Sequence, residues 1–218
     1  MKVKVATRIL EANDKIAVEN RKLFDEANIY VINLMSAPGA GKTSLIERTI
    51  KEVYKKFKLG VIEGDIAGTA DAQRIESLGI PVIQINTGSA CHLDANMITG
   101  AIVDLPLKDI DLLIVENVGN LVCPAEFKVG ENMKVMILSV TEGDDKPLKY
   151  PLMFQESSAL ILNKIDLLPY TNANIEKIKK DSLSLNPSLK IFEVSCKTGE
   201  GIVEWTEWLQ SLVAKIQR

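Results

Sequence analysis

The chain has 218 residues, 46% of them hydrophobic and 25% charged, a balance that is ordinary for a globular protein and excludes a disordered or fibrous chain. Its 26 basic and 29 acidic residues give a formal net charge of -3 without any block of five like charges, so bulk charge does not indicate a nucleic-acid partner. The charged start, residues 1–4, is unlike a signal peptide, and no apolar run is long enough to span a bilayer, so we expect a cytoplasmic protein without a membrane partner.

A leading amphipathic helix is the first predicted element. Its apolar residues fall at near-helical spacing and are predicted to form one buried stripe. The stripe consists of Ile9, Ala12, Ile16, Leu23, Phe24 and Ala27. We therefore divide the chain into an N-terminal helical extension, residues 1–28, and one globular domain, residues 29–218.

Short apolar runs and helical patterns then alternate to the end of the chain, which predicts a βαβ succession. Runs such as residues 112–115 and 159–162 are apolar on both faces, as strands buried between two helix layers must be. The fold class is thus α/β, with a mainly parallel central sheet flanked by helices. Strands are predicted near 29–35, 59–64, 81–86, 112–116, 134–140, 158–163 and 189–194, with helices marked by Ile46, Ile50, Val53, Tyr54 and Phe57 and by Ile202, Trp205, Leu209, Leu212, Val213 and Ile216.

The motif S-A-P-G-A-G-K-T, residues 36–43, follows the first strand and precedes a helix, which is the context that a phosphate-binding P-loop requires. Glycines let backbone N–H groups converge on phosphate oxygens, Lys42 reaches the β- and γ-phosphates, and Thr43 would hold Mg²⁺. Ser36 departs from the usual pattern, which has glycine at the first position. The predicted phosphate-binding residues are Pro38, Gly39, Ala40, Gly41, Lys42, Thr43 and Ser44.

The motif N-K-I-D, residues 163–166, follows a strand at the sheet edge where open α/β folds bind ligands. The Asp166 carboxylate can accept from guanine N1–H and the 2-amino group together, which adenine cannot offer. Asn163 suits the N7 and O6 side of guanine, and the Lys164 stem can lie along the purine face. The segment S-C-K, residues 195–197, resembles the S-A-K element of GTPases. The predicted guanine-binding residues, for GTP or GDP, are Asn163, Lys164, Asp166, Ser195, Cys196 and Lys197.

Two acidic strand ends should face the γ-phosphate. Glu116 and Gly119 resemble the D-x-x-G element of GTPases with Glu in place of Asp, and Asp65 is predicted to position Mg²⁺ or the attacking water, although either acid could instead be a cap or a solvated strand end. Asn120 stands where many GTPases carry a water-orienting Gln, and no arginine is an evident finger, so we predict slow intrinsic turnover, roughly 10⁻⁴ to 10⁻² s⁻¹. The predicted catalytic residues are Lys42, Asp65, Glu116 and Gly119.

Cys91 and His92 are adjacent in a loop, and Cys123 lies just beyond the second acidic strand end. Three scattered cysteines do not make a disulfide framework and indicate a reducing compartment. Thiolate and imidazole together suit Zn²⁺ or Ni²⁺, although a packed cysteine beside a surface histidine is the alternative. A closed structural zinc site has four protein ligands, so a site shared across a dimer axis would supply the missing one. Met133 and Met136 are predicted to be core residues.

These motifs resemble the HypB family, the nickel-incorporation GTPases of hydrogenase maturation, within the dimer-forming (SIMIBI) class of P-loop proteins. The resemblance runs through nearly the whole chain, and its discriminating stretches are C-H-L-D-A, residues 91–95, and N-V-G-N-L-V-C-P, residues 117–124. It implies a GTP-dependent homodimer, a Zn²⁺ or Ni²⁺ site from Cys91, His92 and Cys123, and nickel delivery to the [NiFe]-hydrogenase large-subunit precursor with a HypA-type nickel chaperone. The N-terminal C-x-x-C-G-C site and histidine-rich stretch of some members are absent from this sequence.

Other readings remain open. Urease-maturation GTPases carry a contiguous Cys-Pro-His motif, which this chain lacks, and the ATPases of the same class carry an early P-loop lysine where this chain has Ala37. A regulatory GTPase with packed cysteines and a GTP-binding scaffold without turnover are further alternatives. Because Cys123 follows Gly119 by four residues, a γ-phosphate that orders this segment would also move a metal ligand. The charged segment 142–149 is either a solvated loop or faces nucleotide across a dimer.

Overall fold

The structure is a computed structural model that describes the backbone of residues 5–216 and the side chains of residues 9–216. Residues 1–4 of the predicted extension and residues 217–218 of the predicted domain lie outside the described residues. The predicted division at residue 28 falls between the first helix and the first strand and stays a prediction. Across residues 5–216, no helix is both long enough and apolar enough to cross a membrane.

Within the described residues the core is one seven-stranded sheet in which every neighbouring pair is parallel. The strand order is β3-β2-β4-β1-β5-β6-β7, so the predicted parallel α/β architecture is confirmed. All seven predicted strands are present, with ends shifted by at most a residue or two. They are β1 (Tyr30–Ser36), β2 (Leu59–Asp65), β3 (Val82–Asn86), β4 (Leu112–Glu116), β5 (Met133–Ser139), β6 (Ala159–Asn163) and β7 (Lys190–Glu193).

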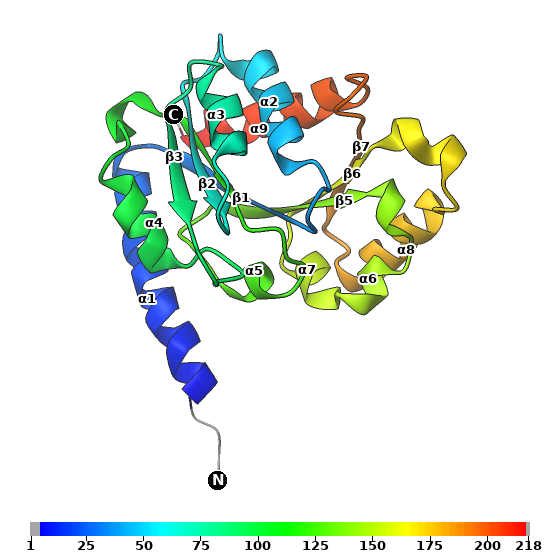
Figure 1. Cartoon of the computed structure of the whole chain (residues 1–218), viewed down its shortest axis with the longest axis horizontal. Coiled ribbons are helices and arrows are strands. Elements are labelled where there is room, and N and C mark those ends of the chain that lie inside the picture. Colours follow the sequence, from blue (N-terminus) through cyan, green and yellow to red (C-terminus); the bar gives the residue numbers. More distant parts are fainter. Residues whose placement is uncertain (1–4, 217–218) are drawn as a thin grey trace.

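Helices cover both faces of the sheet, with α2, α3 and α9 on one face and α1, α4, α5, α6, α7 and α8 on the other (Figure 1). Their bounds are α1 (Val5–Glu26), α2 (Lys42–Val53), α3 (Ala70–Glu76), α4 (Ala95–Ile102), α5 (Cys123–Glu126), α6 (Lys146–Lys149), α7 (Pro151–Gln155), α8 (Ile175–Leu185) and α9 (Ile202–Ile216). Three short 3-10 turns complete the description, at Leu107–Asp109, Val140–Glu142 and Ile165–Tyr170.

Register brings the predicted ligand-binding segments to one edge of the sheet. Glu116 pairs with Leu34 near the end of β1, and Ser139 pairs with Asn163, so the carboxyl ends of β1, β4, β5 and β6 lie side by side. The central strand β1 lies between β4 and β5, where the direction of strand addition changes. This is the switch point at which parallel α/β sheets bind ligands.

The helix α1 differs from its predicted amphipathic pattern. Of the six apolar residues assigned to its buried stripe only Phe24 is fully buried, whereas Ile9 and Leu23 are exposed. The buried face instead carries Asn13, Ala17 and Asn20 at helical spacing. The leading helix is thus confirmed, whereas its predicted buried stripe is wrong, because two amides that are bonded to the backbone of other segments occupy the buried face.

Helix packing elsewhere follows the sequence pattern. Trp205 of α9 is buried against the sheet and donates its indole N–H to Thr49 Oγ1 of α2 at 3.0 Å, which joins the two helices. The helix α2 ends at Val53, so Tyr54 and Phe57, which were predicted to mark this helix, lie beyond its end, and Tyr54 is exposed. Met133 and Met136 are buried, as predicted.

Candidate functional site

The phosphate loop runs from the end of β1 into α2. Gly39 and Gly41 have φ angles of 74° and 105°, a region that side chains with a Cβ rarely adopt, which explains glycine at both positions. Lys42 begins α2, and its Nζ donates to Ser36 Oγ at 3.2 Å. The serine that departs from the usual pattern thus holds the lysine across the mouth of the loop.

Asn163 connects the phosphate loop to the guanine segments. Its Nδ2 donates to the carbonyl oxygen of Ala40 at 2.8 Å, and its Oδ1 accepts from the backbone N–H groups of Lys164, at 2.7 Å, and Cys196, at 3.2 Å. A Cβ at Gly41 would collide with this amide, so glycine is required there. The buried Asn163 side chain is occupied by the backbone, whereas the sequence predicted that it faces N7 and O6 of guanine.

A cavity of about 390 Å³ lies between these segments. Asp166 lines it, and the carboxylate is oriented by the hydroxyl of Ser195, which donates to Oδ1 at 2.6 Å. Lys164, with φ of 64°, reaches across to the carbonyl of Gly39 at 2.7 Å. The other lining residues are Gly41, Ser44, Asn163, Leu167, Cys196 and Lys197, so five of the six predicted guanine residues meet in one cavity with Gly41 and Ser44 of the phosphate loop.

Arg48 of α2 supports the 195–197 segment and was missed by the sequence analysis. Its Nε and Nη2 donate to the carbonyls of Cys196 and Lys197 at 2.7 and 2.8 Å. The arginine therefore shapes the guanine loop without belonging to any motif. Burial raises the pKa of the Cys196 thiol to about 11, so this cysteine is a packed thiol in the guanine loop.

An acidic pocket of about 220 Å³ lies beside the phosphate loop. Glu63 and Glu116 stand opposite each other on β2 and β4, and Asp71 approaches from α3, so that one carboxylate oxygen of each lies within 4.8 Å of the others. Thr43 Oγ1 donates to Glu116 Oε1 at 3.0 Å, and Lys42 Nζ lies 4.0 Å from the same oxygen.

Burial perturbs the two glutamates strongly. It raises the pKa of Glu63 to about 8, with the nearby Glu116 and other carboxylates adding to the effect, and raises the pKa of Glu116 to about 7 against the opposing influence of Lys42 and Thr43. Both residues have one buried oxygen without a hydrogen-bond partner. Hard oxygen ligands with unsatisfied buried atoms suit Mg²⁺, so the residues present fit this ion.

Asp65 lines the same pocket, but its carboxylate is bonded to its own loop. Oδ1 accepts from the N–H of Ile66 at 2.6 Å and Oδ2 from that of Gly68 at 3.1 Å. Thr43 and Lys42 instead approach the carboxylate of Glu116. Sequence analysis missed Asp71, because nothing in the pattern of the loop after β2 shows that α3 brings this residue back to the pocket.

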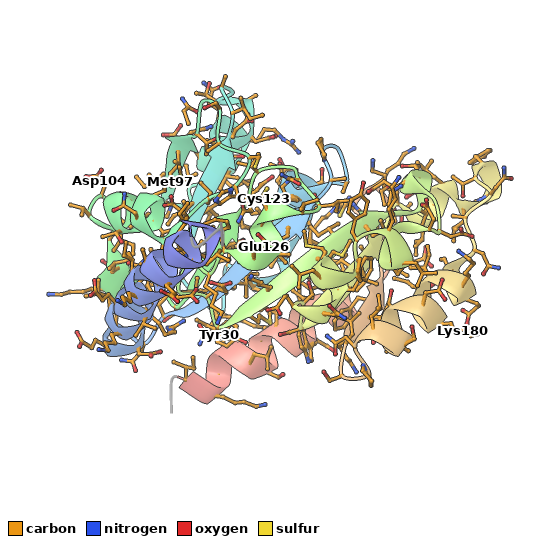
Figure 2. The ribbon with its side chains drawn as sticks, turned by 90° about the horizontal axis from the view of Figure 1, so that it is seen from below. Tyr30, Met97, Asp104, Cys123, Glu126 and Lys180 are labelled. Carbon is orange, nitrogen blue, oxygen red and sulfur yellow. The ribbon has the colours of Figure 1, made fainter. Side chains whose placement is uncertain are left out.

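The predicted metal ligands come together from separate segments. Cys91 Sγ lies 3.0 Å from Cys123 Sγ and 3.8 Å from His92 Nδ1, and one ligand atom of each residue lies within 4.8 Å of the others. Cys123 begins α5, and Figure 2 shows it with Glu126 between the α1 and α4 pair and the α6 to α8 side of the molecule. We call Cys91, His92 and Cys123 the thiol–imidazole cluster.

Neighbouring groups hold this cluster in place. The His92 ring packs on Phe127 with centroids 3.8 Å apart, and burial lowers the pKa of His92, which keeps the imidazole neutral as a metal ligand requires. Asn120 Nδ2 donates to the carbonyl of Cys91 at 3.3 Å. The hydrogen bond with Cys91, together with burial, raises the pKa of the Cys123 thiol.

The buried Asn117 connects the cluster to the phosphate side of the sheet. Its Oδ1 accepts from the N–H groups of Leu93 and Val118 at 2.9 and 3.0 Å, and its Nδ2 donates to Asn33 Oδ1 of β1 at 3.1 Å. Two residues later, Gly119 packs on Pro38 of the phosphate loop, where a Cβ would lie 2.9 Å from Pro38 Cα. Few residues therefore separate the acidic pocket from the cluster.

The segment 142–149 borders another cavity, of about 440 Å³, between the phosphate loop and residues 119–122. Glu142 accepts from the backbone N–H of Ser139 at 2.8 Å in a capping box, and burial raises its pKa. Lys146 lines this cavity and pairs with Asp145 at 3.3 Å. Part of the segment is thus built into the fold, which departs from a wholly solvated loop.

Comparison with known proteins gives consistent matches. The family model described as CobW/HypB/UreG, nucleotide-binding domain, matches residues 30–193. Hydrogenase maturation factor HypB of Escherichia coli (strain K12) is 47% identical over 209 residues, covering 96% of this chain and 72% of that protein. Hydrogenase/urease maturation factor HypB of Helicobacter hepaticus is 41% identical over 212 residues, covering 95% and 87%. The crystal structure of HypB from Helicobacter pylori in complex with nickel superimposes with a TM-score of 0.90 at 40% identity, covering 94% and 96%.

Proposed function

Because this chain belongs to the HypB family, within the CobW/HypB/UreG group of nucleotide-binding proteins, we propose that it uses GTP to deliver nickel to the precursor of the [NiFe]-hydrogenase large subunit. The protein is a P-loop GTPase whose ligands are GTP or GDP and Mg²⁺, with nickel as its cargo. The observation that carries the proposal is the segment 119–123, in which Gly119 lines the acidic pocket and Cys123 belongs to the thiol–imidazole cluster.

Guanine would occupy the 390 Å³ cavity, with Asp166 accepting from N1–H and the 2-amino group. The hydrogen bond from Ser195 supports this role because it fixes the carboxylate before the base arrives. Asn163 would act mainly as a positioning residue that holds the phosphate loop and the guanine loop together. The Lys164 side chain, whose Nζ donates to the carbonyl of Gly39, would cover the purine face.

At the phosphate end, Lys42 would exchange Ser36 Oγ for the β- and γ-phosphates, and the N–H of Gly119, which lines the pocket, would donate to the γ-phosphate. Thr43, Glu63, Asp71 and Glu116 would hold Mg²⁺, which neutralises charge on the β- and γ-phosphate oxygens when bound. Asp65 shapes the loop beside the pocket and is less available to orient water than the sequence suggested. Slow intrinsic turnover remains our prediction for the isolated protein.

Nucleotide state would reach the metal ligands through the short segment that follows β4, residues 117–123. A γ-phosphate in contact with Gly119 changes the packing of this residue on Pro38, and the change passes along residues 120–122 to Cys123. Asn120 and Asn117 bond this path to the loop of Cys91 and His92. GTP and metal would therefore alter each other's affinity by the same factor.

The cluster offers three ligands from one chain, whereas a closed site commonly has four. We therefore propose that a GTP-dependent homodimer completes the site, and that the dimer acts with a HypA-type nickel chaperone and the hydrogenase large-subunit precursor. A hydrogenase maturation role requires partners of this kind, and their identities belong to the proposal. Zn²⁺ suits the same ligand set and is a competing occupant.

The direct test is titration of Ni²⁺ and Co²⁺ into the full chain loaded with GDP or with a non-hydrolysable GTP analogue. We expect thiolate charge-transfer bands that differ between the two nucleotide states and are lost in Cys91→Ala and Cys123→Ala. Cys196→Ala is the matched control, since it removes the remaining cysteine, and should keep the bands. Equal bands in all variants would leave a GTPase without this metal function.

A second client is suggested by one relative, the Helicobacter hepaticus protein, which is a hydrogenase/urease maturation factor. The same GTPase and metal site would serve a urease precursor. Adding the purified chain with Ni²⁺ and GTP to apo-urease and to hydrogenase precursor separates the two clients. Activation of both would support the second client, and activation of the hydrogenase precursor alone would exclude it.

A further inference from the structure

The helix α1 is attached to the molecule by two buried side-chain amides. Asn13 is 7% exposed and Asn20 is 1% exposed, although a helix normally buries apolar residues on its inner face. Burying an amide without partners is unfavourable, so buried amides are retained where their hydrogen bonds are satisfied. The partners of these two amides are backbone groups on either side of the thiol–imidazole cluster.

Both amides bond to Ala95, the first residue of α4. Asn13 Oδ1 accepts the N–H of Ala95 at 2.8 Å, and Asn20 Nδ2 donates to its carbonyl oxygen at 2.8 Å. Thr99 one turn later donates its hydroxyl to Asn20 Oδ1 at 2.8 Å, which fixes the orientation of that amide. Ala95 follows His92 by three residues, so α1 holds the backbone directly after the Cys91 and His92 loop.

The same two amides also bond to the segment after Cys123. Asn13 Nδ2 donates to the carbonyl of Lys128 at 2.8 Å, and Asn20 Nδ2 donates to that of Val129 at 3.3 Å. Gly130 allows the close approach, since a Cβ there would lie 2.8 Å from Asn20 Cβ. Each asparagine thus spans two segments that are far apart in the sequence.

Along both backbone segments, the residues that the two amides bond are close in sequence to the proposed metal ligands. Phe127, whose ring packs on His92, immediately precedes Lys128, and α5 begins at Cys123. The buried Lys134 donates from Nζ to the carbonyl of Ala125 and holds the same short helix from the side of the sheet. The position of Cys123 relative to Cys91 and His92 therefore depends on bonds made by α1 as well as on the sheet.

We propose that Asn13 and Asn20 form an asparagine bridge that positions the thiol–imidazole cluster, so that α1 sets the metal affinity of a site to which it contributes no ligand. The inference rests on the proposed metal function of the cluster. Outer groups that orient metal ligands typically change metal affinity by 10- to 100-fold when they are replaced. A bridge that only attached α1 would change stability and leave the metal site unaltered.

Substitution by aspartate separates these possibilities, because it keeps the size of the side chain and removes its N–H donors. Asn13→Asp retains an acceptor for Ala95 N–H and loses the bond to Lys128, whereas Asn20→Asp loses the bonds to Ala95 and Val129 together. The matched control is Asn186→Asp, since Asn186 also donates to backbone carbonyls, those of Phe154, Gln155 and Ser157, at a turn that carries no metal ligand.

The full chain and its variants are titrated with Co²⁺, and the charge-transfer spectrum, Co²⁺ affinity, GDP affinity and thermal midpoint are measured. We expect Asn20→Asp to weaken Co²⁺ binding by roughly tenfold or more and to shift the spectrum, with a smaller effect for Asn13→Asp. GDP affinity should stay within about twofold, and Asn186→Asp should bind Co²⁺ as wild type does.

Wild-type Co²⁺ affinity and spectrum in both bridge variants would overturn the inference, even if their thermal midpoints fall. If Asn20→Asp does not fold, Asn13→Asp, which loses one bond, decides the question alone. If Cys123→Ala, with both asparagines intact, binds Co²⁺ as tightly as wild type does, the proposed function itself is contradicted. Binding that requires Cys123 but ignores both asparagines would contradict only the bridge.

Discussion

Glu63 and Glu116 are the residues whose charge states are most altered by the fold. Both are buried on neighbouring strands, with pKa values raised to about 8 and about 7. The metal-free, nucleotide-free protein therefore keeps both carboxyls protonated at a pH where ordinary carboxyls are ionised. Binding of Mg²⁺ requires their deprotonation, so the ion has to displace protons below pH 7.

This burial predicts the pH dependence of stability. Unfolded glutamate titrates near 4.5, so between that pH and 7 to 8 the folded state binds more protons than the unfolded state, and the free energy of unfolding falls as pH rises through the window. Urea unfolding of metal-free protein between pH 6 and 8.5 measures the slope.

Glu63→Gln, which removes the higher of the two raised pKa values, is the matched variant for this measurement. We expect a shallower fall in the free energy of unfolding between pH 7 and 8.5. An unfolding free energy that increases with pH over this range in wild type would contradict the assigned burial.

Asp166 supports a second prediction at this scale. Asp166→Asn should weaken GDP binding by roughly 100-fold or more, because hydrogen bonds to a charged acceptor contribute about 1.5 to 3 kcal/mol each. The amide can donate to the 2-carbonyl of xanthine, so the variant should bind xanthosine diphosphate better than wild type does. Fluorescence competition measures both affinities, and unchanged GDP affinity would exclude Asp166 as the guanine acceptor.

The residues that the sequence could not reveal share a physical cause. Arg48 and Asp71 belong to no motif and reach the site only because α2 and α3 return to it in the fold. Lys42, Thr43 and Asp166 could be assigned from short motifs at strand ends, whereas Cys91, His92 and Cys123 were expected to share a site because of the resemblance to the HypB family. The position of Asn163 in the site could be predicted, but its role in joining the loops could not, because its backbone partners Ala40 and Cys196 lie in other loops.

At the scale of elements, parallel strands buried on both faces are easily recognised from uninterrupted apolar runs, and all seven were predictable. The burial pattern of α1 was not, because its inner face contains asparagines whose partners are more than 70 residues away. Periodicity detects apolar burial and cannot detect burial that depends on hydrogen bonds. The error in α1 therefore coincides with the part of the fold where polar packing replaces apolar packing.

The segment from β4 to α5 gives the element-scale prediction. In Gly119→Ala the new methyl group would meet Pro38 at 2.9 to 3.0 Å, so the segment 119–123 has to shift. We expect the nucleotide dependence of metal binding to be lost while GDP binding is retained, as measured by the Co²⁺ titration in both nucleotide states.

Gly100→Ala is the matched control for Gly119→Ala, because the position lies in α4 with no atom within 4 Å of a new Cβ. Alanine in a helix should leave binding unchanged and add slightly to stability. Full nucleotide dependence in Gly119→Ala would show that signals do not pass along this segment.

At the scale of the whole molecule, the incomplete ligand set predicts that metal binding depends on association. If a second chain supplies missing ligands, the apparent affinity for Ni²⁺ rises with protein concentration in the presence of a GTP analogue. Sedimentation velocity and metal titration over the same concentrations test the link. Affinity that is independent of concentration while dimers form would place a complete site within one chain.

The asparagine bridge also has a consequence for the order of events during synthesis. Asn13 is made 115 residues before Lys128, which at about 5 to 20 residues per second is an interval of roughly 6 to 23 s. Ala95, the other backbone partner of Asn13, is made 82 residues after it, so the nascent helix lacks both segments until Ala95 is made and lacks the second until Lys128 follows. Cys91 and His92 likewise emerge from the ribosome before Cys123, so any metal ion met early finds only part of its coordination sphere. A site that needs Cys123 would therefore bind its metal only after β1 to β4 have been translated.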